Sequence, residues 1–402
     1  MEKKEFKPSI RFNGFTEPWE QRKFEEIAVR SSVICSDDTL PRVEYEDIVS
    51  GTGRLNKDIY AKQSSKSGIA FHQGDVLYGK LRPYLQNWLL PTFDGLAVGD
   101  FWVLQPQNAD SSFLYRLIQS RQFDEVANQS TGTKMPRADW KLVSKTVFSI
   151  PSNISEQAAI GTYFTALDSL ITLHQRKVEK LKNLKSAMLD KMFPKEGSNV
   201  PEIRFKGFTE PWEQRKLSEC AGFRRGSFPQ PYGNKEWYDG EGAMPFVQVA
   251  DVSDDMKLVD DTKQKISKSA QPMSVYADKG SVLVTLQGSI GRVAITQYGA
   301  FVDRTVLIFD KYNQDIDKTF WAYIIKEKFI DEARKAPGGT IKTITKEALS
   351  DFDLMLPNYD EQKKLGAFLV SIDLLITLHQ RKCEKLIDCK KAFLEKMIGG
   401  EE

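Results

Sequence analysis

The sequence has few of the residues from which catalytic and metal centres are usually built. It contains three histidines and four cysteines in 402 residues, and no two cysteines form a C-x-x-C pair. This scarcity argues against a zinc site, a disulfide framework and a histidine-based catalytic centre. The expectation is therefore plain buried thiols and no metal.

Long apolar runs and a strong net charge are also missing. No run of 18 apolar residues occurs, and a composition of 41% hydrophobic and 28% charged residues is typical of a globular protein without a transmembrane span. The first 11 residues lack an apolar signal core, so a cytoplasmic location is expected. Because the net charge is only +2, any affinity for nucleic acid must come from local basic surfaces.

The chain repeats itself. The segment 10–24 (IRFNGFTEPWEQRKF) returns at 203–217 (IRFKGFTEPWEQRKL) with 13 of 15 residues identical, and 156–192 matches 361–397 at 20 of 37 positions, including LITLHQRK at 170–177 and 375–382. Between these shared segments the two halves barely agree. We interpret this pattern as one repeated frame that carries two divergent domains, since a repeat protein usually needs three or more units.

The expected fold class is α+β, with two mixed α/β domains separated by a long antiparallel two-helix coiled coil and related by pseudo-twofold symmetry. Length favours two or three domains. The expected divisions are a first domain at 1–151, a helix at 152–193, a linker at 194–202, a second domain at 203–357 and a helix at 358–398.

Both predicted helices carry the 4-3 apolar spacing of a coiled-coil seam. A histidine and a lysine interrupt each seam at matching places, where polar groups can fix the register; His174 and His379 are interpreted as seam residues rather than ligands. The first seam is Ile160, Phe164, Leu167, Ile171, His174, Val178, Leu181, Lys185, Met188 and Met192. The second is Leu365, Leu369, Ile372, Ile376, His379, Cys383, Leu386, Lys390, Phe393 and Met397.

Basic, amide and aromatic side chains on predicted loops are candidates for contacts with phosphates and base edges. For each of them a solvated surface position remains the alternative. In the first domain the candidates are Lys80, Arg82, Tyr84, Gln86, Lys134 and Arg137. In the second they are Arg224, Arg225, Gln287, Ser289, Arg292, Arg304 and Lys342. The segment 224–235 is expected to be an irregular contact loop, because it is rich in Gly and Pro.

Enzyme motifs are absent or incomplete. The segment 74–80 (GDVLYGK) fits the first seven positions of a phosphate-binding loop, but Leu81 stands where Ser or Thr is required, and its Val-Leu-Tyr centre predicts a strand. No N-P-P-Y or D-P-P-Y methyltransferase signature occurs. We therefore expect no catalysis by this chain and no cofactor of its own.

Together, the paired FTEPWEQRK segments, the paired EQ and LITLHQRK helices and the stretch GDVLYGKLRPY closely resemble the specificity (S) subunit of type I restriction-modification systems, across essentially the whole chain. The resemblance implies two target-recognition domains, each binding half of a bipartite, asymmetric DNA site. It also implies helices that set the gap and dock two modification (methyltransferase) subunits. Those partners would use S-adenosylmethionine, and restriction subunits would use ATP and Mg²⁺. A coiled-coil scaffold with protein-binding ends is the alternative, and binding of a bipartite duplex would separate the two.

Overall fold

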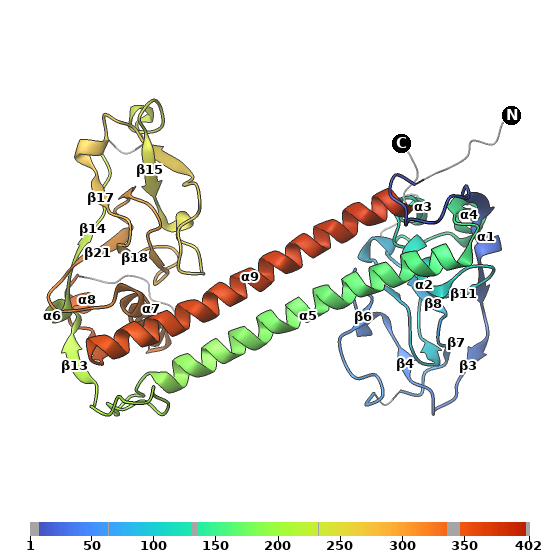
Figure 1. The fold of residues 1–402 in the computed structure, drawn as a ribbon, viewed down its shortest axis with the longest axis horizontal. Helices are drawn as coiled ribbons and strands as arrows, with labels where there is room; N and C mark the ends of the chain where they lie inside the picture. Colours follow the sequence, from blue (N-terminus) through green and yellow to red (C-terminus); the bar gives the residue numbers. More distant parts are fainter. Residues whose placement is uncertain (1–7, 63, 130–134, 232, 336–345, 399–402) are drawn as a thin grey trace. The chain divides into compact units, whose positions relative to one another are not determined.

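The computed structural model describes residues 8–62, 64–129, 135–231, 233–335 and 346–398. The chain divides into two compact units, of which unit 1 is 1–176 with 380–402 and unit 2 is 177–379. Each unit therefore combines one globular domain with a part of both long helices, α5 (Ile154–Met192) and α9 (Tyr359–Ile398) (Figure 1). None of the described helices is long and apolar enough to cross a membrane.

Unit 1 contains two four-stranded sheets. The first has the order β2-β11-β8-β9 and is antiparallel throughout. The second has the order β3-β7-β10-β4, in which only β10 and β4 run parallel. The strands are β2 (Ala28–Ser31), β3 (Ile34–Cys35), β4 (Arg42–Val43), β7 (Gly68–Phe71), β8 (Val76–Gly79), β9 (Trp88–Leu89), β10 (Gly95–Ala97) and β11 (Phe101–Pro106). The short helices α2 (Ser111–Leu117), α3 (Arg121–Ala127) and α4 (Trp140–Lys145) complete the domain.

Unit 2 repeats the first sheet with different side chains, but its second sheet differs in strand order: the parallel pair lies at one edge of the sheet in unit 1 and in the middle of the sheet in unit 2. Its first sheet has the order β14-β21-β18-β19, and its second has the order β16-β15-β20-β17 with one parallel pair, β15 and β20. The strands are β14 (Ala221–Arg225), β15 (Met244–Val247), β16 (Gln264–Ile266), β17 (Val275–Ala277), β18 (Val282–Thr285), β19 (Val293–Ile295), β20 (Ala300–Val302) and β21 (Val306–Tyr312). Helix α7 (Lys318–Lys335) and helix α8 (Lys346–Ser350) follow.

Strand β8 follows the turn at Gly74-Asp75, and strand β18 follows the turn at Gly280-Ser281. Each of these strands lies inside the first sheet of its unit. All four residues of β8 and all four of β18 are buried, because each strand has a neighbour on both edges and both of its faces are covered. The predicted strand at 76–79 is confirmed, which removes the geometry that a phosphate-binding loop needs between a strand and a helix. Stacked and edge-to-face rings, such as Tyr78 on Trp102, fill the core of unit 1.

The repeated anchor segments contribute to a further, two-stranded sheet in each unit. Strand β1 (Glu20–Lys23) pairs antiparallel with β12 (Val147–Ile150), and β13 (Glu213–Lys216) pairs in the same way with β22 (Asp353–Leu356). The anchor thus holds the beginning of each domain against the strand that leads into the long helix. The internal duplication and the α+β fold class are confirmed.

An arginine-glutamate pair closes this frame in each unit. Arg11 donates two hydrogen bonds to the Glu156 carboxylate at 2.6 and 2.7 Å, and Arg204 donates two to Glu361, both at 2.7 Å. Both carboxylates are buried, and the hydrogen bond to Glu156 raises the pKa of the Arg11 guanidinium. Trp19 Nε1 also donates to Glu156 at 3.3 Å.

A glutamine and a glycine are also repeated at the start of each long helix. The glutamine makes hydrogen bonds to the neighbouring backbone, and the glycine allows a close approach of an adjacent segment. Gln157 accepts from the Asp110 amide at 2.9 Å and donates to the Pro151 carbonyl, and Gln362 makes the equivalent contacts in unit 2. A Cβ at Gly161 would lie 1.8 Å from Ser112 Oγ, and one at Gly366 would lie 3.0 Å from the Phe320 amide. Any larger residue would therefore push the adjacent helix away.

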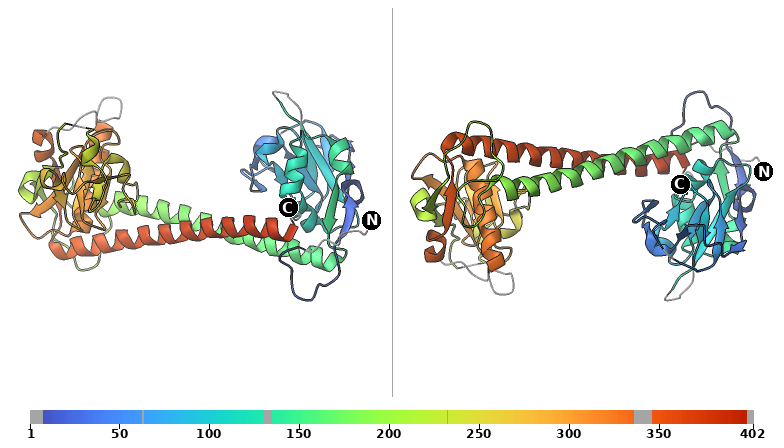
Figure 2. Two further views of the ribbon diagram at one scale, coloured as in Figure 1. Left: turned by 90° about the horizontal axis from the view of Figure 1, so that it is seen from above. Right: turned by 90° about the horizontal axis from the view of Figure 1, so that it is seen from below.

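The long helices pair antiparallel within each unit, and the predicted seam is their least exposed row. In unit 1 the C-terminal part of α9 (red) lies beside the N-terminal part of α5 (green), where Tyr163 meets Phe393 edge to face (Figures 1 and 2). Both seam lysines pair with an aspartate of the other helix. Lys390 Nζ lies 2.6 Å from Asp168 Oδ1 in unit 1, and at the equivalent place in unit 2 Lys185 Nζ lies 2.7 Å from Asp373 Oδ1.

The observed helix bounds can be compared with the expected divisions. Helix α5 begins at 154 and ends at 192, and α9 runs from 359 to 398, which is within two residues of the helices expected at 152–193 and 358–398. The domain divisions themselves remain a prediction, because the compact units cut both helices rather than following the chain.

Candidate nucleic-acid interface

Three strand ends meet at one edge of the first sheet in each unit. Strands β8 and β11 are antiparallel, so the end of β8 and the start of β11 share an edge with the end of β2. In unit 2 the end of β18, the start of β21 and the end of β14 have the same arrangement. Most of the described candidate residues lie on segments that meet at these two edges.

In unit 1 the segment after β8 is held in an unusual conformation. Arg82 and Gln86 both have left-handed backbone angles, with φ of 49° and 54°, and they flank a short 3-10 helix at Pro83–Leu85. Non-glycine residues adopt such angles only where surrounding contacts enforce them. The Arg82 amide donates to the Pro136 carbonyl at 2.7 Å, and the Tyr84 side chain is 57% exposed at the tip. The loop therefore presents an aromatic side chain on a fixed backbone.

Two of the candidate cations share one carboxylate. Asp100 lies 3.5 Å from Lys80 Nζ and 3.1 Å from Arg137 Nη2. The Ala138 amide donates to the Lys80 carbonyl, which fastens the segment around Arg137 to the segment after β8. Partial burial opposes ionisation of Asp100, but the Arg137 hydrogen bond and the charges of Arg137 and Lys80 outweigh it, so the pKa of the carboxyl is lowered.

In unit 2 the segment 286–292 forms a closed turn after β18. The Thr285 hydroxyl donates to the Ser289 carbonyl and accepts from the Arg292 amide. Gln287 and Ser289 are exposed in this turn. The Leu286 amide donates to the Thr305 carbonyl at 2.8 Å, which places the turn next to Arg304.

The arginines of unit 2 differ in how far they are committed to internal contacts. Arg224 pairs with Asp310 at 2.7 Å, and Arg292 pairs with Asp254 at 3.0 Å. Arg304 is exposed and lies over the Phe228 ring, 4.8 Å from its centroid. The expectation of an irregular loop over the whole of 224–235 is wrong at its start, because Arg224 and Arg225 belong to strand β14 and pair with β21.

Three candidates remain to be placed. Lys134 and Lys342 lie outside the described residues. Gln86 is half-buried and hydrogen-bonds the Asp124 carboxylate. The carboxylates that hold the candidate cations were missed by the sequence analysis, because nothing in the sequence marks Asp100 or Asp254 as a partner. The candidate residues as a set remain a prediction.

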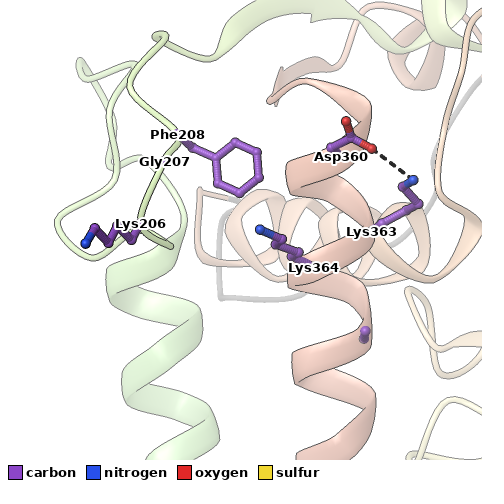
Figure 3. Close-up of a pocket in the computed structure, with 7 residues that line it drawn as sticks. Lys206, Gly207, Phe208, Asp360, Lys363 and Lys364 are labelled. Carbon is purple, nitrogen blue, oxygen red and sulfur yellow. Dashed lines mark ion pairs between the residues drawn. The ribbon is translucent and has the colours of Figure 1, made fainter.

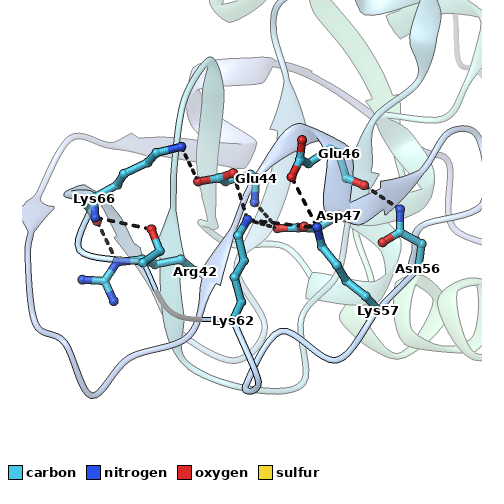
Figure 4. Close-up of polar contacts among 9 residues, drawn as sticks. Arg42, Glu44, Glu46, Asp47, Asn56, Lys57, Lys62 and Lys66 are labelled. Carbon is cyan, nitrogen blue, oxygen red and sulfur yellow. Dashed lines mark hydrogen bonds and ion pairs between the residues drawn. The ribbon is translucent and has the colours of Figure 1, made fainter.

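A charged network lies elsewhere in unit 1 and is self-compensating. The fully buried Asp47 carboxylate lies 2.7 Å from Lys57 Nζ and 3.1 Å from Lys62 Nζ. Glu44 pairs with Lys62 at 2.8 Å and with Lys66 at 3.0 Å (Figure 4). Because each ammonium already has a carboxylate partner, this network links residues 44, 47, 57, 62 and 66 to one another rather than offering free positive charge. No group of side chains among the described residues has the composition of a metal site.

The fold shows that the protein is an internally duplicated chain, in which two divergent α/β domains are built on a repeated frame. Residues 17–183 and 209–387 each match the family model described as the type I restriction modification DNA specificity domain. The chain therefore belongs to this family.

Individual relatives are distant but named consistently. The MjaVIII specificity subunit of Methanocaldococcus jannaschii is 23% identical over 79% of both chains. The putative MjaX specificity subunit of the same organism is 23% identical over 62% of this chain and 57% of its own length. Among solved structures, the type I system S subunit of M. genitalium has a TM-score of 0.64 at 14% identity, covering 98% of this chain and all of that one. A chain from a study of type I complex assembly and conformational transition has a TM-score of 0.54 at 20% identity, covering 94% and 97%.

Proposed function

We propose that this chain selects the DNA sequence for a type I restriction-modification complex, with each domain contacting one half of a bipartite site. One observation carries the proposal: in both units, cationic, amide and aromatic side chains come together at the same sheet edge, but the side chains themselves differ. Equivalent placement on a common frame supports equivalent binding geometry. Different side chains support different base preferences.

The chain is proposed to lack catalytic activity. Its described residues include no metal-ligand group, and its sequence carries no methyltransferase signature. Modification subunits would supply the S-adenosylmethionine chemistry, and restriction subunits would supply the chemistry that uses ATP and Mg²⁺, all in the cytoplasm. The test is methylation of duplex DNA by the purified chain, alone and with its modification subunits. Methyl transfer by the chain alone would contradict the proposal.

The independence of the two domains has its own test. Residues 218–356 can be replaced by the matching domain of another system while both anchor segments stay in place. Methylation mapping should then show one altered half-site and one unchanged half-site. A change in both half-sites would show that the domains do not recognise DNA independently.

Two identical partner copies fit the repeated helices. Leu170 and Leu173 are 44% and 48% exposed on the part of α5 in unit 1, and their equivalents Leu375 and Leu378 are 44% and 46% exposed on α9 in unit 2. Neighbouring exposed leucines indicate a contact surface for another protein. Because the surrounding octapeptide is the same in both halves, we assign each surface to one modification subunit.

The scaffold alternative makes a different prediction. A scaffold with protein-binding ends would show no preference among DNA duplexes, whereas the proposed function requires tight binding only when both half-sites are present. Competition between specific and nonspecific duplex at a fixed salt concentration measures this directly.

A further inference from the structure

The two copies of the repeated frame differ in charge at few places. In the anchor segment only two of 15 positions differ, and one of them replaces Asn13 by Lys206. At the start of the long helix, Ala158 and Ala159 of the first copy correspond to Lys363 and Lys364 of the second. At these three positions, neutral residues of the first half are replaced by lysines in the second; farther along the helices, the copies also differ in charge at 182/387, 183/388 and 186/391.

Lys206 lines the same hollow as Lys363 and Lys364, although 157 residues separate it from Lys363 in the chain. Its side chain extends away from α9, whereas that of Lys364 points toward Phe208 (Figure 3). The hollow has a volume of about 590 Å³ and lies in unit 2, between the anchor loop and the first turns of α9. Lys364 extends from the helix over the Phe208 ring, with Nζ 4.8 Å from the centroid. Lys363 Nζ lies 2.9 Å from Asp360 Oδ1.

The hollow carries a positive charge that its counterpart lacks. Three lysines and one aspartate give +2, whereas the equivalent residues of the first half, Asn13, Ser155, Ala158 and Ala159, are all neutral. The aromatic face and the Asp360 carboxylate also restrict two of the ammonium groups, because each holds one by direct contact. The result is a positive surface with partly fixed geometry.

We propose that this hollow binds a carboxylate-bearing segment of the modification subunit that docks on the second half, so that the two partner copies bind in order, the second half first. The inference rests on the proposed function. The hollow is built only from the repeated frame, which two copies of the same partner would contact in equivalent ways. The candidate DNA contacts, by contrast, come from the divergent segments between the anchors. A partner segment that meets a neutral surface at one half meets a charge of +2 at the other.

The affinity difference should be moderate and sensitive to salt. Exposed ion pairs are worth little individually, so two of them correspond to about a 5- to 10-fold tighter first step. The difference should shrink as salt is raised, because exposed charges are screened. Native mass spectrometry of the full chain titrated with its modification subunit gives both binding constants. Hydrogen exchange at a substoichiometric amount of partner shows which half is occupied first, through protection of 359–370 or of 154–165.

The decisive variant gives the second half the residues of the first. In the variant Lys206→Asn, Asp360→Ser, Lys363→Ala and Lys364→Ala, the two binding constants should become equal within about 2-fold. An unchanged difference would overturn the proposal. So would a variant that loses DNA affinity while partner binding stays as in the wild type, because the occupant would then be DNA.

The reverse variant keeps the test informative if the first one folds poorly. Asn13→Lys, Ser155→Asp, Ala158→Lys and Ala159→Lys place the charged set in the first half. Its affinity for the partner should rise about 5- to 10-fold, with a steeper salt dependence. No change there would refute the inference, while failure of the wild-type chain to bind any modification subunit would refute the proposed function instead.

Discussion

Replacing Glu156 or Glu361 by alanine removes the buried carboxylate that pairs with an arginine in the repeated frame of each unit. Glu156 accepts two hydrogen bonds from Arg11, and its side chain is 0% exposed while that of Arg11 is 15% exposed. Removing one partner of a buried ion pair costs about 3–5 kcal/mol, because the other charge stays buried without compensation. Glu361 and Arg204 form the equivalent pair, so the same range applies in unit 2.

The two sites should nevertheless differ by one hydrogen bond. Trp19 Nε1 donates to Glu156, whereas Trp212 Nε1 is buried without a hydrogen-bond partner among the described residues. A hydrogen bond to a charged group contributes about 1.5–3 kcal/mol. Glu156→Ala should therefore lower the free energy of unfolding more than Glu361→Ala does, by roughly this amount or somewhat less, because the Trp19–Glu156 hydrogen bond is long at 3.3 Å.

Hydrogen exchange measures the free energy of local opening in each unit separately. The amides of β1 and β12 report on Glu156, and those of β13 and β22 report on Glu361, so each variant contains its own unperturbed reference. Glu213→Ala is a matched control, because Glu213 pairs with Arg215 at 2.6 Å but is exposed, and its loss should change stability by less than about 0.5 kcal/mol. Losses below about 1 kcal/mol for both buried glutamates would refute the argument.

Four further results are expected. Replacing Lys80 and Arg82 by alanine should weaken DNA binding and reduce the salt slope by up to about 2, as measured by anisotropy titrations at several salt concentrations; unchanged values would return this loop to an ordinary solvated surface. Asp100→Asn should do the opposite, because it frees cations that the carboxylate now holds. Hydrogen bonding to Lys62 lowers the pKa of Glu44, and lysine contacts outweigh burial to lower the pKa of Asp47. Both carboxylates therefore stabilise unit 1 above about pH 4, and this contribution is lost as the pH falls through their lowered pKa values. Replacing Glu44 by Gln and Asp47 by Asn should flatten this loss of stability in acid, as measured by pH-dependent denaturation, and an unaltered profile would contradict the expectation. One heptad added to the middle of each long helix adds about 10 Å of helix and should lengthen the DNA gap by roughly 3 base pairs. An insertion of four residues should instead impair activity, because it breaks the heptad phase. Methylation mapping is the measurement, and an active heptad variant with an unaltered gap would show that helix length does not set the spacing.

Elements with strong periodicity could be predicted from the sequence. The 4-3 spacing located both long helices and their seams, since a helix buries one row of side chains wherever it packs. The buried strands at 76–79 and 282–285 could also be predicted, because short apolar runs after a glycine turn have few other stable conformations. Repetition alone identified the frame.

The contacts that define the candidate interface could not be predicted. Asp100 lies 20 residues from Lys80 in the chain, and only the antiparallel pairing of β8 with β11 brings them together. Arg224 looked like part of a loop because Gly and Pro follow it, but pairing with β21 outweighs that local preference. Whether a basic side chain is committed to a carboxylate depends on tertiary contacts, so neither composition nor spacing reveals it.

The exchange of helix halves between the two units has a consequence for synthesis. Met397 and Ile398 are buried in the core of unit 1 together with Ile160 and Phe164, and the Ile10 amide donates to the Lys396 carbonyl. The ribosome makes those late residues only after the entire second domain, which at about 5–20 residues per second is roughly 10 to 45 s after residue 176. During that interval the first domain exists with an open apolar seam on its nascent helix. Its final folding step therefore waits for the other end of its own chain, and a chaperone that covers the seam until then would protect it from aggregation.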